Sequence, residues 1–385
     1  MLKILKIKTI IICFVVFLTC VSCFKCNVYA SQNDIYVSAS SAVLYCVNTG
    51  EFIYEKNAQT QTPMASTTKI MTTLLALEQS AISNDIVTIT KDMYAEGSSM
   101  YLEQGNQLRL SDLAVGMMTV SGNDASNAVA LTIGKTFENF AEMMNKKAKL
   151  IGMQNTNFVT PSGLDDENHY STACDMAMLM SYAMNNNAFA KITSKKSIKV
   201  NFINPQDKVI TYENHNKLLS LYKYCNGGKT GYTTTAGRCL VSSANKNGVK
   251  FIAVTLDAPN DWDDHIKMYD YGFSKFTSVK FDDTAYNVKL SVVGGEKANI
   301  SIGAYTPTQV VTKKENEGKV TRSVELEKFI YAPIEMGQVV GKVTYTIDGE
   351  IVATNDLVAN ETVEYKEIER SFLENIFEFL KNLIY

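Results

Sequence analysis

The amino-acid sequence predicts an α+β fold: an antiparallel sheet with surrounding helices, followed by a small all-β sandwich domain and a C-terminal amphipathic helix. Three observations predict it. Two short strand patterns are followed by several helical patterns and then by further strands. Beyond residue 280, short runs rich in Val, Ile, Thr and Tyr alternate with turns. The last 15 residues return to a helical period with one apolar face.

Length and composition agree with two domains. The chain has 385 residues, of which 46% are hydrophobic and 20% charged, close to the average of globular proteins. These values exclude disorder or a coiled coil as a description of the whole chain. The net charge of -3 provides no strong basic field, so we expect no nucleic-acid partner.

Residues 1–30 are predicted to be a secretory signal peptide. Their only charges are four lysines; without them, 33 basic residues face 40 acidic ones, a net charge of -7. An uncharged run over 9–24 precedes Val28-Tyr29-Ala30, a small-x-small pattern that signal peptidases cut. The alternatives are an uncleaved membrane anchor, for which the run is short, and a lipid on Cys20 or Cys23. Neither cysteine has the usual Leu three residues before it.

The cysteines outside the signal indicate no metal site. Cys46, Cys174, Cys225 and Cys239 contain no Cys-x-x-Cys pair, so we expect neither zinc nor another cofactor. Export would permit a disulfide between Cys225 and Cys239, the only pair close in sequence. Buried free thiols are the preferred interpretation for a chain of this size.

Residues 31–277 are predicted to form the domain of helices and sheet. A turn at Asn48-Thr49-Gly50 joins its first two strands, and a buried strand pair and a helix close it. Between them, apolar residues recur at helical spacing. The expected strands are 41–46, 51–55, 239–244 and 251–256, and the expected helices are 66–77, 110–118, 124–133, 137–151, 173–184 and 264–276.

Residues 281–366 are predicted to be the β-sandwich domain, which holds no histidine or cysteine and nothing that looks catalytic. Its expected strands are 287–293, 299–302, 309–312, 323–327, 338–347 and 350–355. Residues 367–385 are predicted to be an amphipathic helix, too short to span a bilayer, that lies in the membrane interface. Docking on the β domain or on a partner is the alternative, since this helix is not basic.

Three short motifs carry the chemistry: Ser66-Thr67-Thr68-Lys69, Ser121-Gly122-Asn123 and Lys229-Thr230-Gly231. Each is weak alone, but the three in this order form a specific combination. Other catalytic machinery is absent from the sequence. There is no Gly-x-Ser-x-Gly elbow and no His-Glu-x-x-His, and the three histidines lie far apart along the chain.

Ser66 and Lys69 are predicted to be the nucleophile and its general base. A spacing of three on a helix puts both side chains on one face, and a serine near the first turn meets the positive end of the helix dipole. A serine hydroxyl needs a base to remove its proton. A lysine amine serves if burial and a second cation, here Lys229, lower its pKa. The alternative is a solvated Lys69, which its apolar neighbours disfavour.

The second motif is expected in a turn between two buried helices, with its polar side chains in a cleft. Ser121 is predicted to pass a proton between Lys69 and the leaving group. Asn123 has donors and an acceptor that suit a substrate amide. The alternative role of Asn123 is to cap the next helix, although Asp124 could provide that cap and leave Asn123 available.

The third motif is expected at an edge strand that binds substrate. Lys229 and Thr230 would hold a carboxylate, and Gly231 would let the substrate backbone approach and add alongside the strand. Gly228-Lys229-Thr230 also matches the end of a P-loop. That motif needs glycine where this chain has Lys223, so the P-loop is rejected.

The ordered motifs resemble those of penicillin-binding proteins and serine β-lactamases. This resemblance implies that the chain also has the fold of these proteins. Longer strings resemble the low-molecular-mass D-alanyl-D-alanine carboxypeptidases, serine peptidase family S11. These strings are Pro63-Met64-Ala65-Ser66-Thr67-Thr68-Lys69, Ser121-Gly122-Asn123-Asp124-Ala125 and His169-Tyr170-Ser171-Thr172-Ala173. The layout of signal, catalytic domain, β domain and C-terminal helix is similar too, so the resemblance covers essentially the whole chain.

The resemblance implies hydrolysis of the terminal D-Ala-D-Ala bond of peptidoglycan stem peptides at the outer face of the cytoplasmic membrane. Ser66 would attack the carbonyl between the alanines, and the backbone N–H groups of Ser66 and Tyr232 would hold the oxyanion. Lys229 and Thr230 would hold the terminal carboxylate. D-Ala leaves, and water releases the acyl group. Penicillins would acylate Ser66 instead.

Two departures from the family pattern concern fine substrate preference. Asn226-Gly227-Gly228 stands where Asp-Gly-x is usual, and Ser162 stands where His or Asn is common. One alternative function is a β-lactamase. The class A enzymes carry a Glu about 36 residues after the Asn, and here that position is Val159, without Glu within four residues. We therefore predict slow deacylation. The other alternative is a non-catalytic penicillin-sensing or wall-binding protein, whose relatives often lose the nucleophile or base that this chain keeps.

Overall fold

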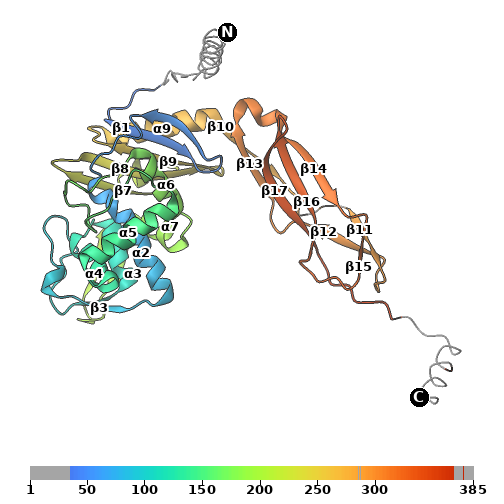
Figure 1. Ribbon diagram of the computed structural model, residues 1–385, viewed down its shortest axis with the longest axis horizontal. Helices are drawn as coiled ribbons and strands as arrows, with labels where there is room; N and C mark the ends of the chain where they lie inside the picture. The colour runs from blue at the N-terminus through green and yellow to red at the C-terminus, as the bar shows by residue number, and fades with distance from the viewer. Residues whose placement is uncertain (1–34, 285, 287, 368–375, 377–385) are drawn as a thin grey trace, which may run out of the picture. The chain divides into compact units, whose positions relative to one another are not determined.

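The computed structural model describes residues 35–284, 286, 288–367 and 376, and Figure 1 shows its elements. The predicted signal and nearly all of the predicted C-terminal helix lie outside these residues. None of the helices within this part of the chain combines the length and apolarity needed to cross a membrane.

A five-stranded antiparallel sheet in the order β2-β1-β9-β8-β7 forms the centre of the first domain. Its strands are β1 Ser41–Cys46, β2 Glu51–Lys56, β7 Cys225–Thr233, β8 Gly237–Lys246 and β9 Val249–Leu256. The inner strands β1, β8 and β9 are buried along most of their length, because helices cover both faces of the sheet. β7 is an edge strand, as the sequence predicts.

Helices pack on both faces of this sheet (Figure 1). Phe251 of β9 packs against Phe273 of α9 at 5.0 Å between ring centroids. Ile252 and Val254, which point the other way, join the core of the remaining helices. The helices are α2 Lys69–Ile82, α3 Leu110–Thr119, α4 Asn123–Gly134, α5 Phe137–Ile151, α6 Ala173–Ala183, α7 Asn187–Thr193, α8 Leu218–Leu221 and α9 Asp261–Lys275.

Five of the six expected helices are found within three residues at each end. The helix expected over 66–77 is α2, which begins three residues later and ends five residues later than expected. Ser66 does not lie on the α-helix but on a 3₁₀ turn, η1 Ala65–Thr68, which leads into α2. Ala65 has φ of +46°, so the chain cannot be α-helical there. Short elements escape sequence prediction because they contain few periods: α7, α8, η2 Lys91–Met93 and the strand pairs β3 Ile86–Thr88 with β4 Gln107–Arg109 and β5 Ser197–Asn201 with β6 Val209–Glu213.

The second domain is built from β-strands. A six-stranded sheet has the order β14-β16-β17-β12-β11-β15, and β10 pairs with β13. The strands are β10 Phe276–Phe281, β11 Lys289–Val293, β12 Asn299–Gly303, β13 Thr308–Lys313, β14 Thr321–Leu326, β15 Phe329–Tyr331, β16 Val339–Ile347 and β17 Glu350–Ala359, and η3 Lys314–Lys319 follows β13. Inward residues such as Leu290, Ile300 and Leu357 form its own core. The sequence does not predict β10 or β15.

The cysteines in the described part of the chain are free thiols. Cys46, Cys174 and Cys239 are buried and Cys225 is half-buried. This confirms the preferred interpretation from the sequence and leaves no bond between Cys225 and Cys239.

Candidate active site

The three motifs meet at one cleft of about 350 Å³. η1 brings Ser66, the turn between α3 and α4 brings Ser121, and edge strand β7 brings Thr230, Gly231 and Tyr232. Ser98, His215, Lys217, Arg238, Asp261 and Trp262 complete the lining. Lys69, Asn123 and Lys229 are buried beside it, with exposed fractions of 4% or less. Segments as far apart in sequence as Ser66 and Trp262 thus meet at this cleft.

Ser66 is held by the packing of its turn against β7. A β-carbon added to Gly231 would lie 2.9 Å from the Ser66 backbone nitrogen and 3.1 Å from the Met64 carbonyl oxygen. Real β-carbons do not approach a backbone nitrogen so closely, so only glycine lets β7 pass this near to η1. The expected need for glycine at this position therefore has a steric cause.

Lys69 is fully buried, and its side-chain nitrogen lies within hydrogen-bond distance of three oxygens. Nζ lies 2.9 Å from Ser66 Oγ, 2.6 Å from Asn123 Oδ1 and 2.7 Å from the Ser162 carbonyl oxygen. Burial lowers the pKa of Lys69 well below its ordinary value, and the charge of Lys229 lowers it further, against an opposing effect of Asp124. A neutral amine can donate to the two carbonyl oxygens and keep its lone pair toward the Ser66 hydroxyl.

Lys229 forms a second buried centre, linked to Ser121. Its Nζ donates to Ser121 Oγ at 3.0 Å and to the Thr230 carbonyl at 2.7 Å. Burial lowers the pKa of Lys229 to about 7. Ser121 has φ of +60°, which directs it into the cleft at the end of α3. Ser121 therefore contacts Lys229, whereas the sequence analysis expected it to pass a proton from Lys69.

Asn123 begins α4, and both ends of its amide are engaged. While Oδ1 accepts from Lys69, Nδ2 donates to the Glu96 carbonyl at 2.6 Å. The side chain of Asn123 therefore does not cap α4. Asp124, which is buried, instead holds a neighbouring loop: its carboxylate accepts from Ser99 Oγ at 2.6 Å and from the Met100 and Leu102 N–H groups. This loop carries Ser98 to the wall of the cleft.

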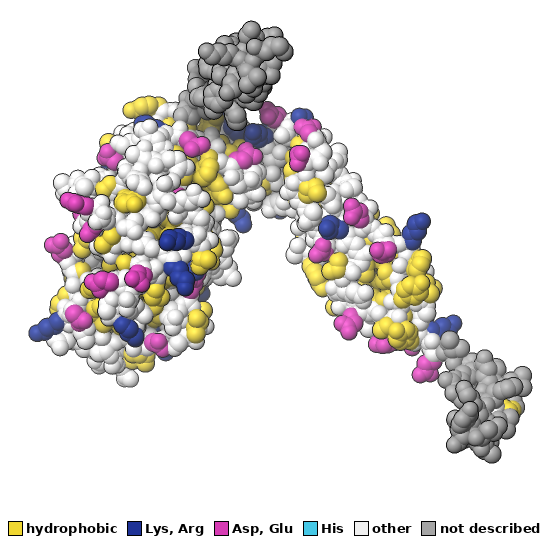
Figure 2. All heavy atoms as spheres, viewed as in Figure 1, with side chains coloured by type: hydrophobic (Ala, Val, Ile, Leu, Met, Phe, Trp, Pro, Cys, Tyr) yellow, Lys and Arg dark blue, Asp and Glu magenta, His cyan; other side chains and the backbone are white. Residues whose placement is uncertain are grey.

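Arg238 is a cleft residue that the sequence analysis missed. It lies opposite Tyr232 in the β7–β8 pair and donates to both carboxylate oxygens of Asp261, at 2.8 and 2.9 Å. Its guanidinium also lies 5.8 Å from the Trp262 ring centroid. The sequence analysis does not predict that residues 229–238 form a hairpin. Such a prediction would have placed Arg238 beside the strand that binds substrate. The lining of the cleft thus holds the cations Lys217 and Arg238 and the carboxylate of Asp261. Charges of both signs are interspersed on the face in Figure 2.

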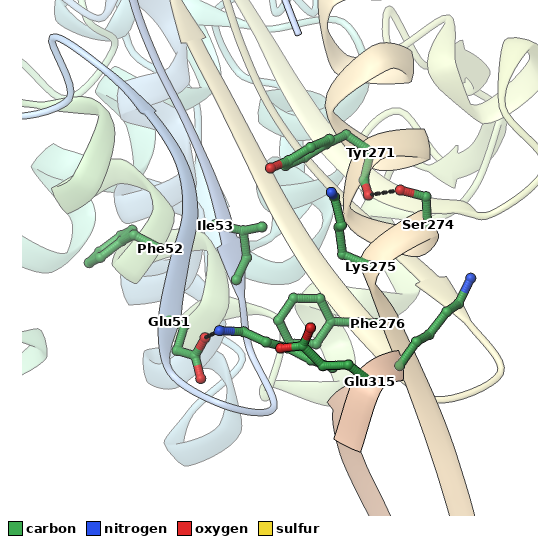
Figure 3. Close-up of a pocket in the computed structure, with 10 residues that line it drawn as sticks. Glu51, Phe52, Ile53, Tyr271, Ser274, Lys275, Phe276 and Glu315 are labelled. Carbon is green, nitrogen blue, oxygen red and sulfur yellow. Dashed lines mark hydrogen bonds and ion pairs between the residues drawn. The ribbon is translucent and has the colours of Figure 1, made fainter. Parts of the chain in front are cut away.

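A second hollow of about 390 Å³ lies between β2, the end of α9 and η3 (Figure 3). Phe52, Ile53 and Phe276 provide apolar walls, and Lys313 pairs with Glu51 at 3.9 Å. The hydroxyl of Ser274 donates to the Tyr271 carbonyl within α9. This hollow contains none of the predicted site residues, so we assign the chemistry to the cleft.

The fold, with a Ser-x-x-Lys turn beside an edge strand that carries Lys-Thr-Gly, defines the class of serine β-lactamases and penicillin-binding proteins. A family model described as D-alanyl-D-alanine carboxypeptidase matches residues 27–260. A second, described as the C-terminal domain of penicillin-binding protein 5, matches residues 273–365. The chain belongs to the D-alanyl-D-alanine carboxypeptidase family.

Characterised relatives cover most of the chain. It is 33% identical to the D-alanyl-D-alanine carboxypeptidase DacF of Bacillus subtilis, over 89% of this chain and 91% of that protein. It is 34% identical to DacA of Haemophilus influenzae, over 85% and 86%. The crystal structure of penicillin-binding protein 5 from Haemophilus influenzae superposes with a TM-score of 0.63 at 33% identity, covering 86% of this chain and 98% of that one. The similarity therefore includes both domains.

Proposed function

We propose that this protein is a serine-type D-Ala-D-Ala carboxypeptidase that removes the terminal D-alanine from peptidoglycan stem peptides through an acyl-enzyme on Ser66. One observation carries the proposal: in a chain of this family, a buried lysine whose pKa is lowered lies 2.9 Å from the hydroxyl of Ser66. That is the geometry required of a nucleophile and its general base.

Acylation begins when neutral Lys69 takes the proton of Ser66. The bonds from Lys69 to Asn123 Oδ1 and to the Ser162 carbonyl orient the amine, so its lone pair faces Ser66 Oγ. The oxygen then attacks the carbonyl carbon between the two D-alanines. The backbone N–H groups of Ser66 and Tyr232 are the proposed donors to the resulting oxyanion.

The leaving D-alanine needs a proton on its amine and a partner for its carboxylate. Lys69 now carries the proton from Ser66, and Ser121 relays it to the nitrogen as the C–N bond breaks. Lys229 orients Ser121 through the 3.0 Å contact. Lys229 and the Thr230 hydroxyl hold the carboxylate, and Gly231 and the edge of β7 admit the peptide backbone. Water then attacks the ester and restores Ser66.

The same steps explain the proposed inhibition by penicillins. Their cyclic amide takes the place of the D-Ala-D-Ala bond, and Ser66 opens it. Release then requires an activated water. In the described loop 155–163 the Ser162 carbonyl accepts from Lys69, and the loop contains no Glu. This favours a carboxypeptidase whose penicillin acyl-enzyme is long-lived over a β-lactamase. The presence of both Ser66 and Lys69 disfavours a non-catalytic penicillin-sensing or wall-binding protein.

We also propose that the protein is exported and works at the cell envelope, on the outer face of the cytoplasmic membrane. Residues 1–30 would be the signal, 31–277 the catalytic domain, 281–366 the β domain and 367–385 the membrane-associating helix. The sequence patterns of both ends support this division, as does the match of a C-terminal domain family to residues 273–365. The membrane surface and the stem peptide are the proposed partners.

D-Ala release from a diacyl-Lys-D-Ala-D-Ala tripeptide tests the proposal. Ser66→Ala and Lys69→Ala should each abolish release. Ser80→Ala should not, because Ser80 lies near the far end of α2 and its hydroxyl donates to the Leu77 carbonyl. Labelling with fluorescent penicillin provides a second measurement. Covalent labelling that survives Ser66→Ala would refute the nucleophile, and rapid turnover of a good penicillin would support the β-lactamase instead.

A further inference from the structure

His169 lies outside the lining of the cleft but contacts both segments that position Lys69. It precedes α6 and is 3% exposed. Its Nδ1 accepts hydrogen bonds from the backbone N–H groups of Val159 at 2.9 Å and Thr160 at 3.1 Å. A ring nitrogen that accepts two bonds carries no proton, so the proton of this neutral imidazole is on Nε2.

The other ring nitrogen points to the turn that carries the nucleophile. His169 Nε2 is 2.8 Å from Thr68 Oγ1, and that hydroxyl donates to the Ala65 carbonyl at 2.8 Å. The direction of this chain of bonds is fixed, since Thr68 has one hydroxyl proton. His169 donates to Thr68, and Thr68 donates to Ala65.

Both ends of this chain bear on the proposed catalytic pair. Ala65 immediately precedes Ser66 and holds the left-handed φ of +46°. On the other side, Val159 and Thr160 begin the loop whose Ser162 carbonyl accepts from Lys69 at 2.7 Å. The loop also presses on the turn directly, because a β-carbon added to Gly163 would lie 1.9 Å from the Ala65 oxygen.

We propose that His169 is a positioning residue for acylation: its imidazole joins the turn 65–68 to the loop 159–162 and so fixes the approach of Lys69 Nζ to Ser66 Oγ. This role deepens the proposed function and rests on it. Misplacing reacting groups by about 1 Å costs on the order of a hundredfold in rate, so a link between the two supports of Lys69 matters to the chemistry.

Only neutral His169 can make these bonds. A proton on Nδ1 would face the N–H groups of Val159 and Thr160. Burial lowers the pKa of His169 to about 4, with Lys69 acting in the same direction and Asp165 and Asp166 opposing it. The link is therefore intact throughout the neutral pH range.

The test measures the second-order rate constant for acylation by a fluorescent penicillin as a function of pH, on the full chain. His169→Ala and Thr68→Val should each slow acylation by about tenfold or more. The acid limb of the profile should also move to higher pH, because a loosened loop lets water reach Lys69 and raises its pKa. Thr68→Ser keeps the hydroxyl and should retain most of the rate.

His265→Ala is the matched control. His265 is also buried and bonded through both nitrogens, to Ser242 at 2.7 Å and Thr255 at 3.1 Å, but neither partner lines the cleft. This variant should lose stability and leave the pH profile of acylation unchanged.

The outcomes separate the role of His169 from the proposed function. Wild-type rate and pH profile in folded His169→Ala would overturn the role, as would the same shift in His265→Ala. If His169→Ala does not fold, an unchanged profile in Thr68→Val overturns it. Wild-type protein that is not acylated, or labelling that survives Ser66→Ala, would instead refute the proposed function itself.

Discussion

At the scale of single residues, the two buried lysines determine how activity depends on pH. Lys69 must be neutral to accept the Ser66 proton, and Lys229 must be charged to hold a carboxylate. Burial and the charge of Lys229 lower the pKa of Lys69, and burial lowers that of Lys229 to about 7. We therefore expect kcat/KM for the tripeptide to rise with pH as Lys69 deprotonates and to fall as Lys229 does.

Lys229→Gln tests both effects. Losing the partner of the substrate carboxylate should weaken transition-state binding by about 2–4 kcal/mol, which lowers kcat/KM for the tripeptide roughly 30- to 1,000-fold. Without the nearby cation, the charged form of Lys69 is less disfavoured, so its pKa rises and the acid limb moves to higher pH. The measurement is the pH profile of acylation by penicillin. An acid limb that stays in place or moves to lower pH would contradict the electrostatic account.

At the scale of elements, the close approach of β7 to η1 is a steric requirement. Gly231→Ala should push the strand away from the turn, since its β-carbon would meet the backbone of Ser66 and Met64. We expect acylation of Ser66 to slow by about a hundredfold with little loss of thermal stability. Gly318→Ala is the control, because nothing lies within 4 Å of a β-carbon there. Equal acylation rates in the two variants would exclude the requirement.

The β domain contains a buried carboxylate that links three of its segments. Asp283 is fully buried and accepts from Thr308 Oγ1 at 2.6 Å, Tyr345 OH at 2.6 Å and Arg322 at 2.7 Å. Burial raises its pKa, but these hydrogen bonds outweigh it, and the pKa lies below its ordinary value. A lowered folded-state pKa stabilises the protein above the unfolded pKa, and this stabilisation is lost as pH falls through the folded value.

Asp283→Asn should therefore cost about 1–3 kcal/mol at pH 7, and the difference from wild type should shrink as the pH falls below 3.8, the ordinary pKa of an aspartate. Thermal unfolding followed by circular dichroism at both pH values measures it. Asp282→Asn, at the exposed neighbouring position, is the matched control and should change stability little. A difference that is as large at low pH as at pH 7 would argue against the charge as its source.

Elements with regular periods could be predicted from the sequence, and so could the motif side chains. The apolar spacing of 137–151 gives α5 its observed bounds, and the motifs place Ser66, Lys69 and Lys229 around one cleft. The carbonyl groups of Ser162 and Glu96 could not be predicted, because backbone atoms are the same in every residue and only the fold places them. His169 belongs to the family-like string 169–173, but its hydrogen bonds could not be predicted, because its partners lie in irregular segments that have no periodic pattern.

At the scale of the whole molecule, catalysis and membrane attachment are predicted to depend on different parts of the chain. Every residue that lines the cleft lies between 66 and 262, whereas the predicted apolar helix follows at 367–385, after the β domain in the sequence. Removing the last 19 residues of the signal-free protein should therefore leave D-Ala release unchanged and abolish sedimentation with phospholipid vesicles. A full-length variant with Phe372, Phe379 and Leu383 changed to Ser keeps the length and charge and should behave like the truncated form. Vesicle binding that persists in both would place the membrane contact elsewhere, whereas loss of activity on truncation would show that the C-terminal segment docks on the protein instead.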